Sequence, residues 1–215
     1  MTSDPNLARL IGRSSSHFTR LARLFAEELG VPCAFAPLYD LTSRDPADYG
    51  GNPALKLPVL QLPQGSVFGA ENICRALAGL AAQPRRIVWT EQLPDLRARN
   101  AQELIWHGMG AQVQWVFGMQ VAQLPADNIY FAKAADGLRN ALAWLDANLE
   151  AVLHSLPPRD LSLLEASLFC LVEHLDFRQT LPRTPYRHLL AFADAFRTRP
   201  SAQRTLYAYD VAAPG

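Results

Sequence analysis

Lysine is almost absent from this chain of 215 residues, in which 18 arginines and only two lysines carry the positive charge. The aspartates and glutamates number 20 and balance them, so the formal net charge is zero. Nucleic acids and anionic membranes attract proteins that have an excess of basic residues. We therefore expect no nucleic-acid partner and no membrane partner. The avoidance of lysine also makes the position of Lys56 informative.

Cysteine is scarce as well, and Cys33, Cys74 and Cys170 form neither a C-x-x-C pair nor a spacing typical of a metal site. We expect all three to be reduced and buried, and we expect no bound metal ion. The sequence has no unbroken apolar run of about 18 residues, so no membrane-spanning helix is expected. Because no charged and apolar leader segment is seen either, we expect a cytoplasmic protein.

The first 82 residues alternate between strand-like and helix-like patterns. The expected strands cover 7–12, 31–38, 58–62 and 66–69, and the expected helices cover 16–29 and 72–82. A β-α-β start implies that the first two strands pair in parallel. Residues 1–82 are therefore predicted to form a thioredoxin-like α/β domain.

Helical periodicity dominates after the linker Pro84-Arg85-Arg86, and residues 87–215 are predicted to form an all-α domain. Ser162 and Glu165 have the S-x-x-E spacing of a capping box, which predicts a helix start. Three apolar stripes at helical spacing mark the expected buried faces. They are Leu104, Ile105, Met109, Val113, Val116 and Phe117; Leu138, Leu142, Leu145 and Leu149; and Leu164, Leu168, Val172 and Leu175.

Two short segments have the strongest functional signals. In the first, a strand runs into a polar loop with Ser14, Ser15 and Ser16, and a helix that ends at Gly30 follows. In the second, residues 52–60 read Asn-Pro-Ala-Leu-Lys-Leu-Pro-Val-Leu, which places a lysine and an apolar residue before a proline at a strand start. Taken alone, such a proline is more often an ordinary edge-strand proline than part of a site.

In this order, and with the ending Arg199-Pro200-Ser201 of the last predicted helix, these segments resemble the glutathione S-transferase family over nearly the whole chain. The resemblance implies a cis bond between Leu57 and Pro58, and a Leu57 backbone that pairs with the cysteinyl unit of glutathione. It also implies that Lys56 reaches the glycine carboxylate of glutathione, for which a compact ammonium is suited. On spacing alone, Lys56 is equally well read as a solvated loop lysine.

The same resemblance assigns the amino end of glutathione to the helix that is predicted near residue 72. Glu71 stands at the position of the family's acidic residue, which meets the ammonium group of the ligand. Asn72 replaces the family's serine, and it can cap the helix and donate from its amide. Helix N-terminal N–H groups suit the γ-glutamyl carboxylate. Glu71 and Asn72 are therefore expected to bind glutathione.

Ser16 stands at the family's catalytic serine position, fourteen residues before the helix-ending Gly30. The family lowers the pKa of the glutathione thiol, because the thiolate is the nucleophile. A serine hydroxyl and the positive end of the first helix both favour the thiolate. Ser14 and Ser15 are close enough to exchange roles with Ser16, and His17 stands where many members have proline.

The resemblance also implies an acceptor-substrate pocket on the first long helix of the second domain, although such a stripe is more often helix core than pocket. Its residues are Trp106, Met109, Gly110 and Val113. The expected function is a serine-type glutathione transferase of detoxification, a homodimer with glutathione as co-substrate and a hydrophobic small-molecule electrophile as acceptor. One alternative is a catalytically silent glutathione-fold module for binding or protein interaction. Another is a glutathione-dependent isomerase, whose Ser-Ser-Cys signature is not matched.

Overall fold

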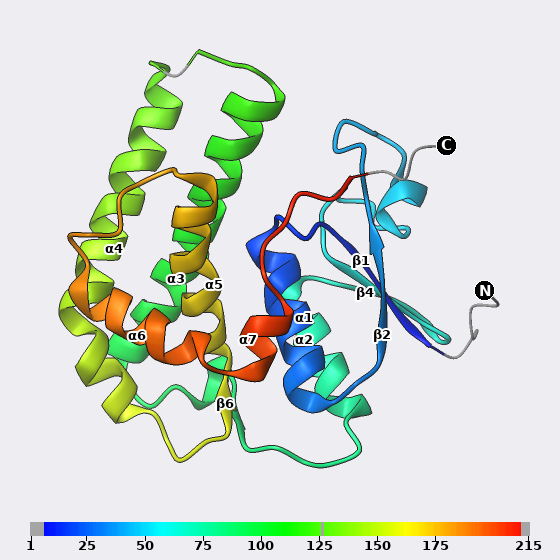
Figure 1. Ribbon diagram of the computed structural model, residues 1–215, viewed down its shortest axis with the longest axis horizontal. Helices are drawn as coiled ribbons and strands as arrows, with labels where there is room; N and C mark the ends of the chain where they lie inside the picture. The colour runs from blue at the N-terminus through cyan, green and yellow to red at the C-terminus, as the bar shows by residue number, and fades with distance from the viewer. Residues whose placement is uncertain (1–6, 126, 212–215) are drawn as a thin grey trace. The chain divides into compact units, whose positions relative to one another are not determined.

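The computed structural model describes residues 7–125 and 127–211, which divide into two compact units (Figure 1). Among the described residues, the first unit comprises 7–85 together with 198–211. The second unit comprises Arg86–Arg197. Apolar side chains are buried in both units, as expected for two separately packed cores.

The first unit is built on a mixed four-stranded sheet with the order β2-β1-β3-β4. The strands are β1 (Ala8–Gly12), β2 (Cys33–Pro37), β3 (Val59–Leu62) and β4 (Gly65–Phe68). β1 pairs in parallel with β2 and antiparallel with β3, and β3 and β4 form an antiparallel hairpin. The parallel pair confirms the β-α-β start that the sequence predicts.

Two helices, α1 (His17–Leu29) and α2 (Ala70–Leu80), pack against each other on one face of this sheet (Figure 1). The apolar face of α1 is buried at Leu21, Phe25 and Leu29, at the spacing of one helical side. This arrangement is the thioredoxin-like fold that the sequence predicts for the first domain. A short 3-10 helix, η1 (Pro46–Tyr49), lies between β2 and β3.

The second unit is mainly helical. Its helices are α3 (Leu96–Trp115), the π-helical η3 (Val116–Val121), α4 (Ile129–Ser155), α5 (Leu163–Arg178) and α6 (Arg187–Arg197). The short strands β5 (Ile87–Val88) and β6 (Leu161–Ser162) pair in parallel, and the 3-10 turn η2 (Thr90–Gln92) follows β5. The predicted stripes on α4 and α5 are buried, which confirms them as core faces.

The predicted stripe on α3 is partly wrong. Met109 is fully buried, whereas Val113 is exposed. Gln112 takes the next buried position instead, and its Nε2 donates to the Leu171 carbonyl at 3.4 Å. The last residue of the stripe, Phe117, lies in η3 and is exposed. A π-helical turn contains more residues than an α-helical one, so it shifts the later side chains away from the buried face.

The carboxyl-terminal segment differs from the prediction that residues 87–215 form one helical domain. A final short helix, α7 (Pro200–Arg204), contacts α1 of the first unit. The contact includes a bidentate ion pair in which Arg199 donates to Glu28 at 2.7 and 2.9 Å. Residues 198–211 therefore pack with the α/β unit.

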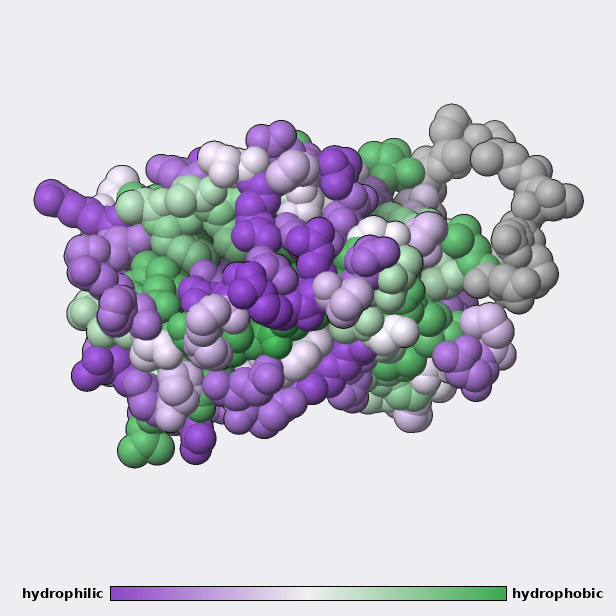
Figure 2. All heavy atoms as spheres, turned by 90° about the horizontal axis from the view of Figure 1, so that it is seen from below, coloured by the Kyte–Doolittle hydropathy of each residue, from purple (hydrophilic) through white to green (hydrophobic). Residues whose placement is uncertain are grey.

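Hydrophilic and hydrophobic residues are interspersed over the face of the molecule that Figure 2 shows. Among residues 7–125 and 127–211, no helix has the length and apolar character needed to cross a bilayer.

Candidate functional site

Residues 13–16, called the Ser16 loop, join β1 to α1. Ser16 is the N-cap of α1 with an extended backbone (φ −98°, ψ 130°), and its Oγ accepts from the N–H of Thr19 at 3.4 Å. The N–H of Ser16 donates to the Arg13 carbonyl at 3.0 Å. A hydroxyl that accepts one hydrogen bond keeps its own proton for donation. Ser16 can therefore donate to an anion placed at the start of α1, where the helix dipole also favours negative charge.

The end of β2 and the first turn of α1 both support the Ser16 loop. Arg13 donates from its N–H to Thr19 Oγ1 at 3.2 Å and from Nη1 to the Tyr39 carbonyl at 2.9 Å. The N–H of Leu38 donates to the Gly12 carbonyl at 2.9 Å. A Cβ at Gly12 would lie 2.5 Å from the Thr19 side chain, so this close approach requires glycine. β1 is thus held tightly against α1 immediately before the serines.

The three serines of the loop differ in exposure. Ser14 and Ser15 are 9% and 2% exposed, whereas Ser16 is half-buried. Both backbone groups of Ser14 are engaged, because its N–H donates to Asp210 Oδ2 at 2.8 Å and its carbonyl accepts from the N–H of Ala208 at 3.4 Å. Ser16 is therefore the most exposed of the three.

Asn52 organises the loop that precedes Pro58. The Leu57–Pro58 peptide bond is cis. Asn52 is buried, its Nδ2 donates to the Lys56 carbonyl at 2.8 Å, and its Oδ1 accepts from the N–H of Ala54 at 3.0 Å. Lys56 is exposed, and Leu57 is half-buried. The two hydrogen bonds of the Asn52 side chain thus fix the backbone conformation of the loop that contains Lys56 and Leu57.

The register of the sheet brings this segment to the Ser16 loop. Ile11 lies opposite Val59 in the antiparallel β1–β3 pair, and β3 begins at Val59. Continuing the register by two residues places Leu57 opposite Arg13, beyond the last paired residues. Leu57 therefore lies outside the strand pairing of β3, at a position where an extended peptide can pair with a backbone edge.

The pairing of β3 with β4 brings the start of α2 to the same end of the sheet. Phe68 lies opposite Val59, and Gly69 follows as the N-cap of α2 with a φ of 86°. Glu71 and Asn72 therefore lie in the first helical turn, at the end of the sheet where the Ser16 loop also lies. The structure brings together the residues that the sequence predicts for the glutathione site, although they come from three separate segments.

Glu71 and Asn72 both make contacts within the helix start. Glu71 Oε1 accepts from Arg75 Nε at 3.1 Å and from its Nη2 at 2.7 Å. Asn72 Nδ2 donates to the Phe68 carbonyl at 3.1 Å. The prediction of Asn72 as the helix cap is wrong, because Gly69 turns the chain into a helix that already begins at Ala70. Its amide instead satisfies a carbonyl of the preceding strand.

The residues predicted for the acceptor pocket lie on α3 and differ in exposure. Met109 is fully buried, Val113 is 38% exposed, and Trp106 and Gly110 are half-buried. Met109 therefore belongs to the helix core. Trp106, Gly110 and Val113 follow one another at helical spacing and form a partly exposed strip.

The cysteines offer no activated thiol. Cys74 and Cys170 are buried as predicted, but Cys33 is only half-buried because it begins β2 at the edge of the sheet. Burial raises the pKa of the Cys33 thiol to about 11, so this thiol is protonated at neutral pH. Within the described residues, no group of three or more histidine, cysteine, aspartate or glutamate side chains is placed to hold a metal ion.

Sequence reasoning missed two residues of this site, Asn52 and Asp210. Asn52 had a usable signal, because asparagine before proline favours a turn and its side chain often bonds the backbone two residues later. No local sequence signal identifies Asp210, because its partner Ser14 lies 196 residues away.

Residues 10–85 match a family model described as the glutathione S-transferase N-terminal domain. A comparison with curated proteins found no match. The family match covers all of the sheet except the first two residues of β1, and it includes the Ser16 loop, the cis-proline segment and α2.

Solved structures share the fold over nearly the whole chain. A glutathione S-transferase from Methylobacillus flagellatus KT with glutathione bound has a TM-score of 0.74 and 22% identity, covering 94% of this chain and 100% of that chain. A glutathione transferase family member from Pseudomonas fluorescens Pf-5 with bound glutathione has a TM-score of 0.76 and 22% identity, with 94% and 99% covered. A glutathione S-transferase from Methylobacterium radiotolerans JCM 2831, in complex with glutathione sulfonate, has a TM-score of 0.71 and 23% identity, with 97% and 99% covered. At such identities the likeness shows the fold.

Proposed function

We propose that the protein is a glutathione transferase, because residues 10–85 match the family model of the glutathione S-transferase N-terminal domain. In this proposal it ionises the glutathione thiol for attack on a hydrophobic electrophile. The observation on which the proposal depends most is the half-buried hydroxyl of Ser16 at the N-cap of α1. The register of the sheet places Leu57 and the start of α2 at the same end of the sheet.

Ser16 acts on the thiol by stabilising its anion. A free thiol with a pKa of about 8.5 is only a few per cent ionised at neutral pH. Donation from Ser16 Oγ and the first N–H groups of α1 both favour the thiolate, and the thiol proton leaves to solvent. A decrease of one to two units in the thiol pKa corresponds to about 1.4 to 2.7 kcal/mol. One charge-assisted hydrogen bond and a helix N-terminus are together of that size.

The tripeptide is held by groups that surround Ser16 without taking part in the chemistry. The exposed Lys56 ammonium reaches the glycine carboxylate, and the Leu57 backbone before Pro58 pairs with the cysteinyl unit in strand fashion. Glu71 receives the ligand ammonium, and Asn72 with the first N–H groups of α2 receives the γ-glutamyl carboxylate. This division predicts that binding and thiol activation are separable by mutation.

The acceptor side of the proposal is assigned to α3. Trp106, Gly110 and Val113 form its partly exposed strip, and an aromatic and aliphatic surface suits a hydrophobic small molecule. Met109, which is fully buried, is left out of this strip. We also propose that the protein is a cytoplasmic homodimer with a role in detoxification. Sedimentation of the purified protein tests the oligomeric state.

The replacement Ser16→Ala tests the proposal. We expect a decrease in turnover at neutral pH of about 8- to 25-fold, because the thiol pKa rises by one to two units and the unassisted thiol is still a few per cent ionised. The dissociation constant for glutathione should change little, since Lys56, Leu57 and Glu71 remain. Raising the pH should partly restore activity, because more thiol then ionises without help. Conjugation assays and calorimetric titration measure the two quantities.

Two results would contradict the assignment. Unchanged activity and thiol pKa in Ser16→Ala would move the role to Ser14, Ser15 or a backbone N–H, and Ser14→Ala and Ser15→Ala variants would separate these. A wild-type protein that binds glutathione without lowering its thiol pKa would instead favour the catalytically silent module. The observation that favours this second function is that Glu71, the residue proposed to bind the ligand ammonium, already accepts hydrogen bonds from Arg75.

A further inference from the structure

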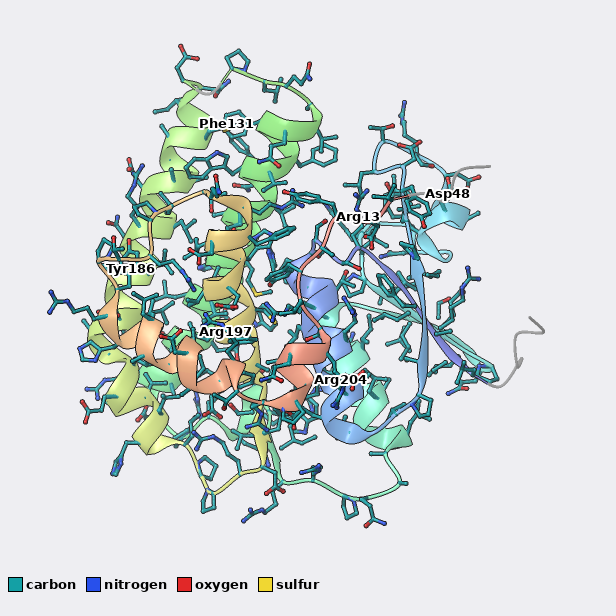
Figure 3. All side chains as sticks on the ribbon, in the orientation of Figure 1. Arg13, Asp48, Phe131, Tyr186, Arg197 and Arg204 are labelled. Carbon is teal, nitrogen blue, oxygen red and sulfur yellow. The ribbon has the colours of Figure 1, made fainter. Side chains whose placement is uncertain are left out.

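The carboxyl-terminal segment of residues 205–211, called the strap, passes over the Ser16 loop within the first unit. Asp210 Oδ2 accepts from the N–H of Ser14 at 2.8 Å, and the N–H of Ala208 donates to the Ser14 carbonyl at 3.4 Å. The strap therefore forms hydrogen bonds with both the N–H and the carbonyl of Ser14, two positions before Ser16. In Figure 3 the labelled Arg13 lies where this segment passes the loop.

Asp210 makes the strongest of these contacts. Its side chain is 10% exposed, and its Oδ2 lies 4.0 Å from Arg13 Nε. Its charge also attracts Arg23, whose guanidinium lies over the ring of Phe35. A hydrogen bond from a backbone N–H to a carboxylate is about twice as strong as one between neutral groups. We therefore expect Asp210 to dominate the hold of the strap on the loop.

A second anchor holds the strap on the other side of Ser16. Arg20 is 1% exposed, its guanidinium lies 4.4 Å from the centre of the Tyr207 ring, and its Nη2 donates to the Ala202 carbonyl at 3.3 Å. Arg20 is one helical turn beyond Ser16, and its N–H donates to the Ser16 carbonyl at 2.8 Å. The strap thus contacts the chain at Ser14 before Ser16 and at Arg20 after it.

We propose that Asp210 is a positioning residue for thiol activation, which holds Ser14 so that Ser16 Oγ stays aimed at the bound thiol. The inference rests on the proposed role of Ser16. Hydrogen bonds weaken steeply with misalignment, so a loop released from the strap would stabilise the thiolate less. The charge of Asp210 has the opposite effect, because a nearby anion disfavours a thiolate. Removal of the hydrogen bond should therefore raise the thiol pKa, whereas removal of the charge should lower it.

The test compares the full-length variants Asp210→Ala and Asp210→Asn with the wild type. Asp210→Asn removes the charge but keeps an oxygen that can accept from Ser14. Glu27→Ala is the matched control, because Glu27 pairs with Arg204 between α1 and α7, away from the Ser16 loop. The thiolate of bound glutathione is titrated by ultraviolet absorbance, and backbone hydrogen exchange of the Ser16 loop is measured without glutathione.

For Asp210→Ala we expect the thiol pKa to rise by about half to one unit, which lowers the thiolate fraction at neutral pH by up to about eightfold. The decrease should shrink at alkaline pH, and exchange at Ser14 should accelerate because its N–H has lost its acceptor. Asp210→Asn should stay within about twofold of the wild type, since the acceptor is kept. The Glu27→Ala control should match the wild type in both measurements.

Three outcomes would overturn the proposal. An unchanged thiolate fraction in Asp210→Ala, with or without faster exchange, would mean that Asp210 only fastens the strap. An increase in thiolate in both Asp210 variants would mean that charge outweighs positioning. A wild-type protein that leaves the thiol un-ionised would overturn this proposal together with the role of Ser16, whereas the first two outcomes leave the role of Ser16 intact.

Discussion

At the scale of single residues, Glu71 pairs with Arg75 in the structure and is proposed to bind the ligand ammonium. Its carboxylate accepts two hydrogen bonds from Arg75, one turn further along α2, and the proposed function assigns it the ammonium group of glutathione. Both Glu71 and Arg75 are only part-buried, so their ion pair contributes little free energy. A ligand ammonium can therefore replace or share the Arg75 contact at small cost.

Replacing Glu71 should weaken glutathione binding. We expect Glu71→Ala to cost about 1.5 to 3 kcal/mol of binding free energy, because a charge-assisted hydrogen bond to the ammonium is lost. Arg75→Gln is the matched control, since it removes the competing cation and should leave affinity unchanged or tighter. Isothermal titration calorimetry measures both. Equal affinity of Glu71→Ala and wild type would reduce Glu71 to a helix-start residue and favour the silent module.

At the scale of elements, the start of α5 is more than a simple cap. The Oγ of Ser162 accepts from the N–H of Glu165 at 3.0 Å and donates to its Oε2 at 2.7 Å. Arg159 donates to the same carboxylate through Nε at 2.5 Å and Nη2 at 2.8 Å. The bonds to Glu165 raise the pKa of Arg159 and connect the segment before β6 to the first turn of α5. The capping serine that the sequence predicts is present, and Arg159 extends it into a small network.

Removing this cap should destabilise the helical unit. Ser162→Ala is expected to lower the free energy of unfolding by about 1 to 2 kcal/mol, because a buried helix N–H loses its acceptor. Ser155→Ala is the control, since the Ser155 hydroxyl only donates to the Val152 carbonyl at the end of α4. That change should cost less than about 0.5 kcal/mol. Urea unfolding followed by circular dichroism measures the difference, and equal costs would deny Ser162 a capping role.

At the scale of the whole molecule, the chain returns to its first unit at the carboxyl end. Glu28 on α1 accepts the bidentate bonds of Arg199 and a bond from Ser201 Oγ. Burial tends to raise the pKa of Glu28, but the hydrogen bonds from Arg199 and Ser201 lower it below its ordinary value of 4.5. The ionised carboxylate therefore stabilises the folded form.

The stabilisation by Glu28 should depend on pH. A lowered pKa contributes stability above the ordinary value of 4.5, and this contribution is lost as the pH falls through the pKa of the folded form. Glu28→Gln is thus expected to cost about 1 to 3 kcal/mol at neutral pH and progressively less in acid. Glu27→Gln, which breaks the exposed pair with Arg204, should cost under about 1 kcal/mol. Urea unfolding across a pH series measures both, and a cost for Glu28→Gln that is constant with pH would contradict the argument.

The sequence by itself determined the four strands of the first unit, the two helices that pack on its sheet, and the place of Ser16 at a helix start. Periodicity, the Gly30 stop and the capping serine act over one or two turns, so neighbouring residues contain the whole signal. The buried stripes of α4 and α5 were predictable for the same reason. The segment around Pro58 was also found locally, because its order of residues resembles a known family.

Only the tertiary structure decided the contacts of Asp210, the pairing of Glu28 with Arg199 and the burial of Met109 beside an exposed Val113. The first two join residues that are 196 and 171 positions apart. No local pattern records which residue meets another at such a distance, because the choice depends on how the last helix packs on the first unit. The burial of Met109 beside an exposed Val113 depends on which neighbouring helix covers α3. At the next buried position of α3, Gln112 replaces the apolar residue that periodicity predicts.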